Sequence, residues 1–460
     1  MEDLWELYNE CKSGNLEEIQ QLHAHGADVT QSNDEGATPM LIACLNGHFE
    51  LVKWLYANGA AIDVTQSNDE GTTPMLVACD EGNIELVKWL YENGAKMDVT
   101  RPDNDGCTPM FIACQGGHHD VFQWLYENGA ANDVRQPDNN GMTPMFIACV
   151  REVFTDVFKW LYKNGAANDV RQPDNKGMTP MFVACLKGDL EVVQWLYKNG
   201  AANDVRQPDN NGITPMFIAC MKGHLGIVQW LYKNGAKMDV TRPDNKGTTP
   251  MFIACMKGHL KLVKWLYENG AANDVRQPDN KGTTPMFIAC LKGRFELVKW
   301  LYENGAKMDV TRPNNSGAIP MLWACQNNHF MIVQWLLTHG AATDVMRPNS
   351  KGITPLESAC RQDHLDIVDM FISKGYPPTG PILRLYRFLT QENRTLLHTH
   401  ATSARGDHEG FVTFMVYVRI SSKIYIENIH DMVWKTNMFG FLCGSERTRF
   451  LWQQILSAGV

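Results

Sequence analysis

One motif recurs along most of this 460-residue chain, and a well-formed copy, residues 177–201, reads GMTPMFVACLKGDLEVVQWLYKNGA. The glycine that opens the motif recurs every 35 residues, with one step of 36, at Gly36, Gly71, Gly106, Gly141, Gly177, Gly212, Gly247, Gly282, Gly317 and Gly352. A fixed period of this length indicates one structural unit that stacks on copies of itself, because a single unit cannot bury its apolar face alone. We therefore predict a solenoid.

Each unit is predicted to contain two short helices and a loop. Thr179 followed by Pro180 is typical of a helix start, since the hydroxyl caps free N–H groups and proline loses no hydrogen bond at the first helical position. The first helix is expected over about residues 181–186. Apolar residues at helical spacing predict a second helix over about residues 190–198. Residues 201–211 are rich in turn-forming side chains and predict a loop.

The repeated motif Gly-x-Thr-Pro-Met-Phe-Ile-Ala-Cys, with Gly-His-x-x-(Leu/Ile)-Val after it and Asn-Gly-Ala at its end, resembles the ankyrin repeat. The resemblance implies an all-α repeat solenoid of stacked helix-turn-helix ankyrin units with extended fingers. Residues 36–375 hold ten such repeats, and residues 1–35 resemble a degenerate N-terminal capping repeat, so that eleven are expected. Residues 376–460 form a small mixed C-terminal segment of unassigned fold, a possible cap, with a helix expected over Ile382–His398 and strands within Phe411–Ile426.

The period here is two residues longer than the family's usual period of about 33. The additional residues follow Gly-Ala, as in Ala201-Ala202-Asn203, and predict a longer finger. The resemblance also implies that the histidines of the Gly-His turn link adjacent repeats by hydrogen bonds; these are His48, His118, His224, His259 and His329. We expect a recurring aspartate to fix the turn of each finger; this set comprises Asp63, Asp98, Asp133, Asp169, Asp204, Asp239, Asp274, Asp309 and Asp344.

Eleven of the thirteen cysteines occupy one equivalent position per repeat, on the expected buried side of the first helix. They are Cys11, Cys44, Cys79, Cys114, Cys149, Cys185, Cys220, Cys255, Cys290, Cys325 and Cys360. Stacked helices would hold neighbouring members about 10 Å apart, too far for a disulfide. We interpret them as small core residues in a reducing compartment. The sequence has no Cys-x-x-Cys pair, so no zinc site is predicted.

The formal net charge of −9 argues against a nucleic-acid-binding surface, which usually needs a basic domain. The acidic N-terminus lacks the pattern of a signal peptide, and the longest apolar run, Phe411–Ile420, is too short to span a membrane. We therefore expect a soluble cytoplasmic protein that does not insert into membranes.

The array repeats every candidate catalytic residue, whereas an active site needs its groups placed once. No enzyme activity, metal site or cofactor is therefore predicted for it. The C-terminal segment holds His398, His400, Asp407, His408 and Glu409. We interpret these residues as a solvated loop, with metal binding as the alternative. A small C-terminal enzyme is a further hypothesis, although no paired acid and base is visible there.

The candidate binding residues are those that vary between otherwise near-identical repeats. In proteins of the resembled family, partners usually bind a concave face built from finger tips and first helices. Three candidates precede Thr-Pro: Met142, Met178 and Ile213. Eight follow the ladder cysteine: Leu186, Lys187, Met221, Lys222, Met256, Lys257, Leu291 and Lys292. Four lie in the finger: Arg206, Arg242, Arg276 and Arg312.

Together these residues predict a basic stripe with flexible apolar side chains, which suits an extended, partly acidic protein partner. The leading hypothesis is therefore a non-catalytic scaffold that binds a protein through the concave groove. The alternative is a substrate-selecting adaptor, for example of the ubiquitin-ligase type, whose C-terminal segment recruits other machinery. Copying during recent duplication would also account for the repeated lysines.

A tryptophan ladder marks the second helices at Trp54, Trp89, Trp124, Trp160, Trp195, Trp230, Trp265, Trp300 and Trp335. We interpret it mainly as packing between adjacent repeats, with a row of aromatic docking sites as the alternative.

Overall fold

The computed structural model describes residues 2–151, 155–362 and 364–376, and all regular structure within them is helical. The expected helix over Ile382–His398, the expected strands and the histidine-rich segment lie outside these described residues. The chain divides into two compact units, Met1–Asp274 (unit 1) and Val275–Val460 (unit 2).

Pairs of short helices follow the period of the sequence. The first helices are α1 (Glu2–Ser13), α3 (Pro39–Leu45), α5 (Pro74–Asp80), α7 (Pro109–Gly116), α9 (Pro144–Arg151), α11 (Pro180–Lys187), α13 (Pro215–Lys222), α15 (Pro250–Lys257), α17 (Pro285–Leu291), α19 (Pro320–Gln326) and α21 (Pro355–Arg361). The second helices are α2 (Leu16–Ala24), α4 (Phe49–Ala57), α6 (Ile84–Glu92), α8 (His119–Glu127), α10 (Thr155–Leu161), α12 (Leu190–Leu196), α14 (Leu225–Lys233), α16 (Leu260–Leu266), α18 (Phe295–Leu301), α20 (Phe330–Thr338) and α22 (Leu365–Ser373). The described residues therefore contain the eleven helix pairs that the sequence predicts.

A short 3-10 helix follows most second helices and leads into a loop. These 3-10 helices are η1 (Ala61–Thr65), η2 (Ala95–Val99), η3 (Ala131–Arg135), η5 (Ala167–Arg171), η7 (Ala202–Arg206), η8 (Lys237–Val240), η10 (Ala272–Arg276), η12 (Lys307–Val310) and η13 (Ala342–Met346). In four repeats a wide turn joins the second helix to the 3-10 helix: η4 (Tyr162–Ala166), η6 (Tyr197–Ala201), η9 (Tyr267–Ala271) and η11 (Tyr302–Ala306). The residues that lengthen the period thus lie in the 3-10 helices, at the base of the fingers.

The Thr-Pro pair starts the first helices as predicted. In α15, the hydroxyl of buried Thr249 accepts a hydrogen bond from the backbone N–H of Phe252 at 3.2 Å, and Pro250 opens the helix. The tenth repeat has Ile319 in place of the threonine, and α19 starts without a side-chain cap. The helix starts are therefore set locally by the sequence.

Apolar side chains between the paired helices form the core of each repeat. In α15 the run from Met251 to Cys255 is buried, and in α16 Val263 and Leu266 are fully buried. All the ladder cysteines except Cys360 are buried, which confirms their interpretation as core residues.

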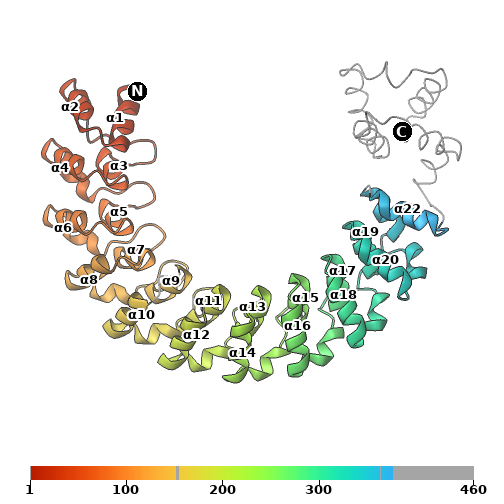
Figure 1. Cartoon of the computed structure of the whole chain (residues 1–460). Coiled ribbons are helices and arrows are strands. Elements are labelled where there is room, and N and C mark those ends of the chain that lie inside the picture. The colour runs from red at the N-terminus through yellow and green to blue at the C-terminus, as the bar shows by residue number, and fades with distance from the viewer. Residues whose placement is uncertain (1, 152–154, 363, 377–460) are drawn as a thin grey trace, which may run out of the picture. The chain divides into compact units, whose positions relative to one another are not determined.

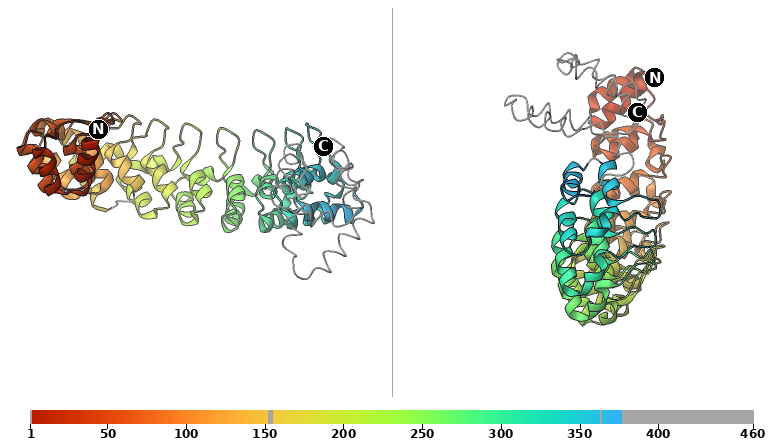
Figure 2. Two further views of the ribbon diagram at one scale, coloured as in Figure 1. Left: turned by 90° about the horizontal axis from the view of Figure 1, so that it is seen from above. Right: turned by 90° about the vertical axis from the view of Figure 1, so that its right-hand side faces the viewer.

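Within unit 1, the first helices lie side by side along one side of the stack and the second helices along the other (Figure 1). Neighbouring first helices pack directly on one another, as α5 does on α7 and α11 on α13. The loops of unit 1 project together from one edge of the stack (Figure 2). Each repeat of unit 1 thus presents a first-helix side, a second-helix side and a row of loops.

Candidate protein-interaction surface

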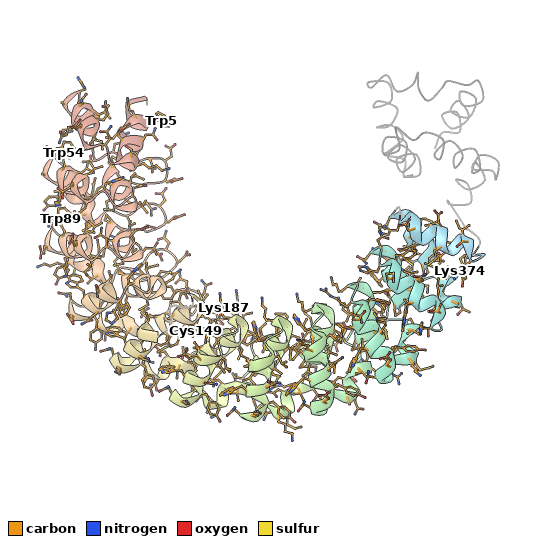
Figure 3. The ribbon with its side chains drawn as sticks, viewed as in Figure 1. Trp5, Trp54, Trp89, Cys149, Lys187 and Lys374 are labelled. Atoms are coloured by element: carbon orange, nitrogen blue, oxygen red, sulfur yellow. The ribbon has the colours of Figure 1, made fainter. Side chains whose placement is uncertain are left out.

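Three lysines project from the first-helix side of unit 1. Lys187, Lys222 and Lys257 end α11, α13 and α15, and all three side chains are exposed. A glycine in the left-handed conformation follows each lysine and ends the helix, with φ of 95° at Gly188. Figure 3 shows Lys187 on the first-helix side, opposite the side that carries Trp54 and Trp89. We call these three residues the lysine row.

An apolar side chain precedes each member of the lysine row. Leu186, Met221 and Met256 are half-buried, so part of each remains accessible beside the charge. The carbonyl of Met221 accepts a hydrogen bond from Nε2 of His259 at 3.2 Å, and the next repeat thereby fixes the backbone at this position. In unit 2, half-buried Leu291 and exposed Lys292 occupy the equivalent positions at the end of α17.

The candidates that precede Thr-Pro lie where the loops return to the first helices. Met142, Met178 and Ile213 are all half-buried. The backbone N–H of Met142 donates to Oδ1 of Asp138 at 2.7 Å, and that of Ile213 donates to Oδ1 of Asp209 at 2.8 Å. Their backbone is therefore held by the loop, and their side chains are only partly available to a partner.

The finger arginines are engaged in ion pairs. Nε of Arg206 lies 3.3 Å from Oδ1 of Asp239, and Nη1 of Arg242 lies 3.8 Å from the same oxygen. In unit 2, Arg276 and Arg312 pair in the same way with Asp309, at 3.4 and 3.6 Å. One buried carboxylate therefore offsets part of the charge of each arginine pair, and the positive field of these fingers is weaker than the sequence alone indicates.

The expectation that the recurring aspartates fix the finger turns is wrong. They lie in the 3-10 helices before the loop, and all nine are buried, with exposed fractions from 0% to 9%. The turn is fixed by a later residue, such as Asp209, whose Oδ1 accepts from the N–H groups of Asn211 and Ile213. Because both positions carry acidic residues in most repeats, the sequence pattern did not separate their roles.

Arginines reach the buried aspartates from two sequence positions. The forward arginines, two residues after one aspartate, pair with the aspartate of the following repeat; they are Arg135, Arg171, Arg206 and Arg276, at 3.1–3.4 Å. The local arginines, three residues after an aspartate, pair with that same aspartate; they are Arg101, Arg242, Arg312 and Arg347, at 3.5–3.8 Å.

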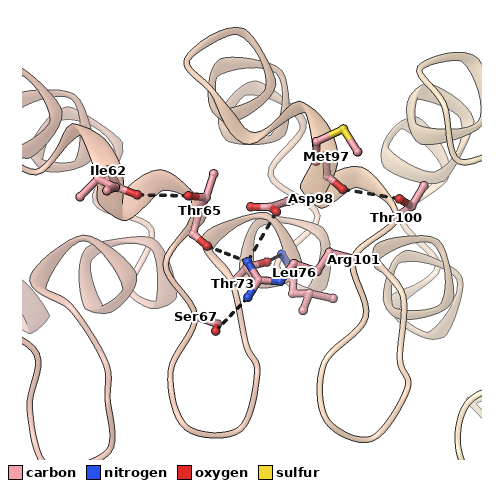
Figure 4. A network of polar contacts seen from close by, with 9 residues as sticks. All are labelled: Ile62, Thr65, Ser67, Thr73, Leu76, Met97, Asp98, Thr100 and Arg101. Carbon is pink, nitrogen blue, oxygen red and sulfur yellow. Dashed lines mark hydrogen bonds and ion pairs between the residues drawn. The ribbon is translucent and has the colours of Figure 1, made fainter.

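A local arginine also bridges to the preceding repeat. Nη1 of Arg101 lies 3.7 Å from Asp98 and donates to the carbonyl of Thr65 at 2.8 Å, while Nη2 donates to Ser67 at 3.2 Å (Figure 4). The arginine thus joins two adjacent repeats of unit 1 through one side chain. This function of the arginines was not predicted, although their spacing from the aspartates is visible in the sequence.

Three aspartates have neither kind of arginine. Asp63, Asp133 and Asp274 are each followed three residues later by glutamine, and threonine occupies the forward position of the preceding repeat. Their Oδ2 atoms are buried and lack a hydrogen-bond partner among the described residues, but this oxygen is equally unpartnered in five aspartates that an arginine pairs, so only the missing ion pair distinguishes the three positions. The five are Asp98, Asp169, Asp204, Asp239 and Asp344. Burial raises the pKa of Asp133 to about 6 and that of Asp274 to about 7. Burial, together with the charge of Asp28, raises the pKa of Asp63 to about 6.

The second-helix side is an aromatic packing surface. Tyrosines at the ends of the second helices contact the tryptophan of the next repeat edge to face, as in Tyr91 with Trp124 at 5.1 Å and Tyr197 with Trp230 at 5.1 Å between ring centroids. The ladder interpreted as inter-repeat packing is therefore confirmed, and such pairs add to the stability that burial supplies.

Histidines of the Gly-His turn connect adjacent repeats, as expected from the resemblance. Nε2 of His118 donates to the carbonyl of Asp80 at 2.7 Å, and Nε2 of His48 donates to that of Lys12 at 3.0 Å. In unit 2, His329 and His364 occupy the equivalent position without a preceding glycine, and each donates in the same way to a backbone carbonyl, of Leu291 and Gln326 respectively, at 3.0 Å. These histidines therefore link adjacent repeats and stabilise the stack.

Within the described ranges, no group of three or more histidine, cysteine or acidic side chains is placed to hold a metal ion. A helix long and apolar enough to cross a bilayer is likewise absent from this part of the chain. Burial raises the pKa of the buried ladder thiols, to about 12 for Cys44, which makes them poor nucleophiles.

Comparison with known proteins agrees with this architecture. Protein phosphatase 1 regulatory subunit 27 of Homo sapiens is 40% identical to this chain over 54 residues, and the same subunit of Mus musculus is 39% identical over 54 residues. Each match covers 12% of this chain and only 35% of the relative. The family model for ankyrin repeats in three copies matches residues 7–103, 97–172, 151–242, 239–312 and 308–379. Because these matches cover most of the chain, it belongs to the ankyrin repeat family.

Proposed function

We propose that this protein is a non-catalytic, cytoplasmic binding scaffold that holds an extended, acidic and partly apolar protein segment along the lysine row. The observation that carries the proposal is the repeated pairing of exposed Lys187, Lys222 and Lys257 with half-buried Leu186, Met221 and Met256 on consecutive packed helices. Exposed lysines attract acidic groups, and methionine adapts to irregular apolar surfaces. The similarity of 54 residues to a phosphatase regulatory subunit supports a role in binding proteins.

The spacing of the row defines the length of the bound segment. Packed helices lie about 8–10 Å apart, so three consecutive first helices present charges over about 16–20 Å. An extended peptide advances about 3.3–3.6 Å per residue, and about six residues span that distance. The expected ligand therefore carries acidic residues about three positions apart, with apolar side chains between them.

Selection from a random peptide library on the full-length protein tests this function. The enriched peptides are expected to combine Asp or Glu with Leu, Met or Phe, and their affinity should fall as salt rises. The variant K187E/K222E/K257E should weaken binding about tenfold or more, since each exposed ion pair contributes about 0.2–1 kcal/mol and reversal adds repulsion.

The matched control is K198E/K233E/K264E, which makes the same change of net charge in the same three repeats on the second-helix side. Each of these lysines is exposed. Circular dichroism checks the fold of both variants, because glutamate at a helix C-terminus is unfavourable. Equal loss of binding in the two variants, or enrichment of peptides without acidic residues, would refute the proposal.

A further inference from the structure

The repeats provide an internal comparison for one buried group. At six of the nine equivalent positions an arginine of this chain pairs with the buried aspartate, and at Asp239 and Asp309 two arginines do so. Asp63, Asp133 and Asp274 occupy the same place in the 3-10 helix, are 3–9% exposed and have no such pair within the described residues. A buried carboxylate without a cation is unfavourable, so these positions favour a cation from elsewhere.

We propose that Asp63 and Asp133 bind arginine side chains of a partner peptide. We call the six repeats in which an arginine of this chain pairs with the aspartate the sibling repeats. At Asp63 and Asp133 the guanidinium of the ligand takes the place that this arginine occupies in the sibling repeats. This inference uses residues separate from the lysine row and does not depend on the function proposed for that row.

The sibling repeats show that such a guanidinium is reachable from solvent. The forward arginines remain 48–52% exposed while they pair with a buried aspartate, and the local arginines remain 38–43% exposed. At the unpaired positions the residues that would carry these arginines are short or point to water: Thr100 and Gln136 at Asp133 are both exposed. A side chain from outside can therefore approach along the same path.

The chemistry at these positions selects arginine. A metal ion needs several ligands, and the described residues hold no group of three or more acidic, histidine or cysteine side chains that could bind one, although the charge of Asp28 does act on Asp63. In the siblings, guanidinium N–H groups approach both the carboxylate and a neighbouring carbonyl, as Arg347 does with Asp344 at 3.5 Å and the carbonyl of Thr311 at 3.0 Å. Guanidinium supplies several donors in one plane, whereas the ammonium of lysine is a single point of charge.

The positions of Asp63 and Asp133 also set the spacing in the partner. They lie two repeat steps apart in unit 1, which is about 16–20 Å at the usual separation of packed helices. Two arginines five or six residues apart in an extended peptide span this distance. The middle repeat offers no position, because Asp98 is already paired with Arg101.

The test uses the full-length protein and a fluorescent twelve-residue Gly-Ser peptide that carries two arginines six positions apart. Binding is measured by fluorescence anisotropy at low salt. We expect saturable binding that falls at least tenfold when citrulline, the neutral analogue, replaces both arginines. The variant D63N/D133N should lose binding to the same extent, since the amide keeps the shape of the side chain and removes its charge.

A second variant fills the positions from within the chain. Gln66 and Gln136 have backbone conformations (φ −75°, ψ 126° and φ −69°, ψ 117°) close to that of Arg347 (φ −78°, ψ 116°). Q66R/Q136R should therefore form local pairs with Asp63 and Asp133 and weaken peptide binding at least tenfold. The control Q172R/Q207R adds the same charge beside Asp169 and Asp204, which Arg135 and Arg171 already pair. The control should bind the peptide with less than a twofold change.

Three outcomes would overturn the proposal: no saturable binding up to millimolar peptide, equal affinity for the citrulline peptide, or equal loss of binding in Q66R/Q136R and Q172R/Q207R. The last result would show that the peptide responds only to net charge. Circular dichroism of each variant confirms that a loss of binding does not reflect unfolding.

Discussion

The substitution Gln136→Arg tests the electrostatics of the buried aspartates most directly. Burial raises the pKa of Asp133 to about 6, from an ordinary value near 4. Two pKa units correspond to about 3 kcal/mol of unfavourable ionisation at neutral pH. The sibling Arg347 is 42% exposed and lies 3.5 Å from its aspartate, so solvent screens much of the attraction. We therefore expect Gln136→Arg to raise the free energy of local opening by about 1 kcal/mol at pH 7.5.

The pH dependence gives the sign of the effect. Because the pKa of Asp133 is raised in the folded protein, its contribution to stability is full below about pH 4 and is lost as the pH rises through about 6. Burial is the cause of this shift, with no neighbouring charge contributing. The advantage of Gln136→Arg should therefore be present at pH 7.5 and shrink at pH 5, where Asp133 is largely protonated in the wild type.

Native-state hydrogen exchange measures this difference, because it reports the free energy of local opening in each repeat separately from that of global unfolding. Variant and wild type are compared at the same pH, in the amides of α7 to α10. Gln172→Arg is the control, since Arg135 already pairs with Asp169. Equal stabilisation by the two substitutions, or an advantage of Gln136→Arg that is as large at pH 5 as at pH 7.5, would refute the reasoning.

Three further predictions concern the stack itself. Thr249→Ala should lower the free energy of unfolding by about 1 kcal/mol, because it removes the side-chain cap of α15. Thr248→Ala, one residue earlier, should lower it less, and denaturation of the two variants with urea compares them. Gly71→Ala should lower the free energy of unfolding by about 1–3 kcal/mol more than Gly47→Ala does. Both glycines have positive φ, but a methyl group at Gly71 would meet backbone and side-chain atoms of the next loop at 2.7–2.8 Å, whereas one at Gly47 would meet nothing within 4 Å. Thermal melts of the two variants test this. Iodoacetamide at pH 7.5 should modify Cys44 only after denaturation, since burial raises its thiol pKa to about 12; mass spectrometry of native and unfolded samples detects the difference.

The fold could be predicted from the sequence because its determinants are local and repeated. Thr-Pro marks the helix starts, the cysteine ladder marks the buried face, and the tryptophan ladder marks contacts between repeats; the structure confirms each. The exposure of the lysine row agrees with the candidate surface, but what binds there depends on a partner that the chain does not encode.

The candidate arginines show what periodicity does not reveal. Arg206 and Arg242 are one repeat apart in sequence, yet both pair with Asp239, one forward and one locally. A pattern repeated every 35 residues shows that a position recurs, but it does not tell whether a long side chain contacts its own repeat or the next. Only the three-dimensional structure shows which aspartate each arginine contacts. It therefore also shows which aspartates lack an arginine.

Whether the buried aspartate of a repeat is paired depends on the residues at only two positions. An aspartate is paired when the preceding repeat has a forward arginine or its own repeat has a local one, and Asp239 has both. Exchanging arginine, threonine and glutamine at these exposed or half-exposed positions leaves the buried core of the repeat unchanged. Near-identical repeats can therefore differ in whether a buried carboxylate is paired within the chain, while helix starts, cysteines and aromatic contacts stay the same. Under the proposal above, a single substitution at a singly paired aspartate creates or fills a binding position, and each unpaired aspartate costs the local stability of the stack about 1 kcal/mol.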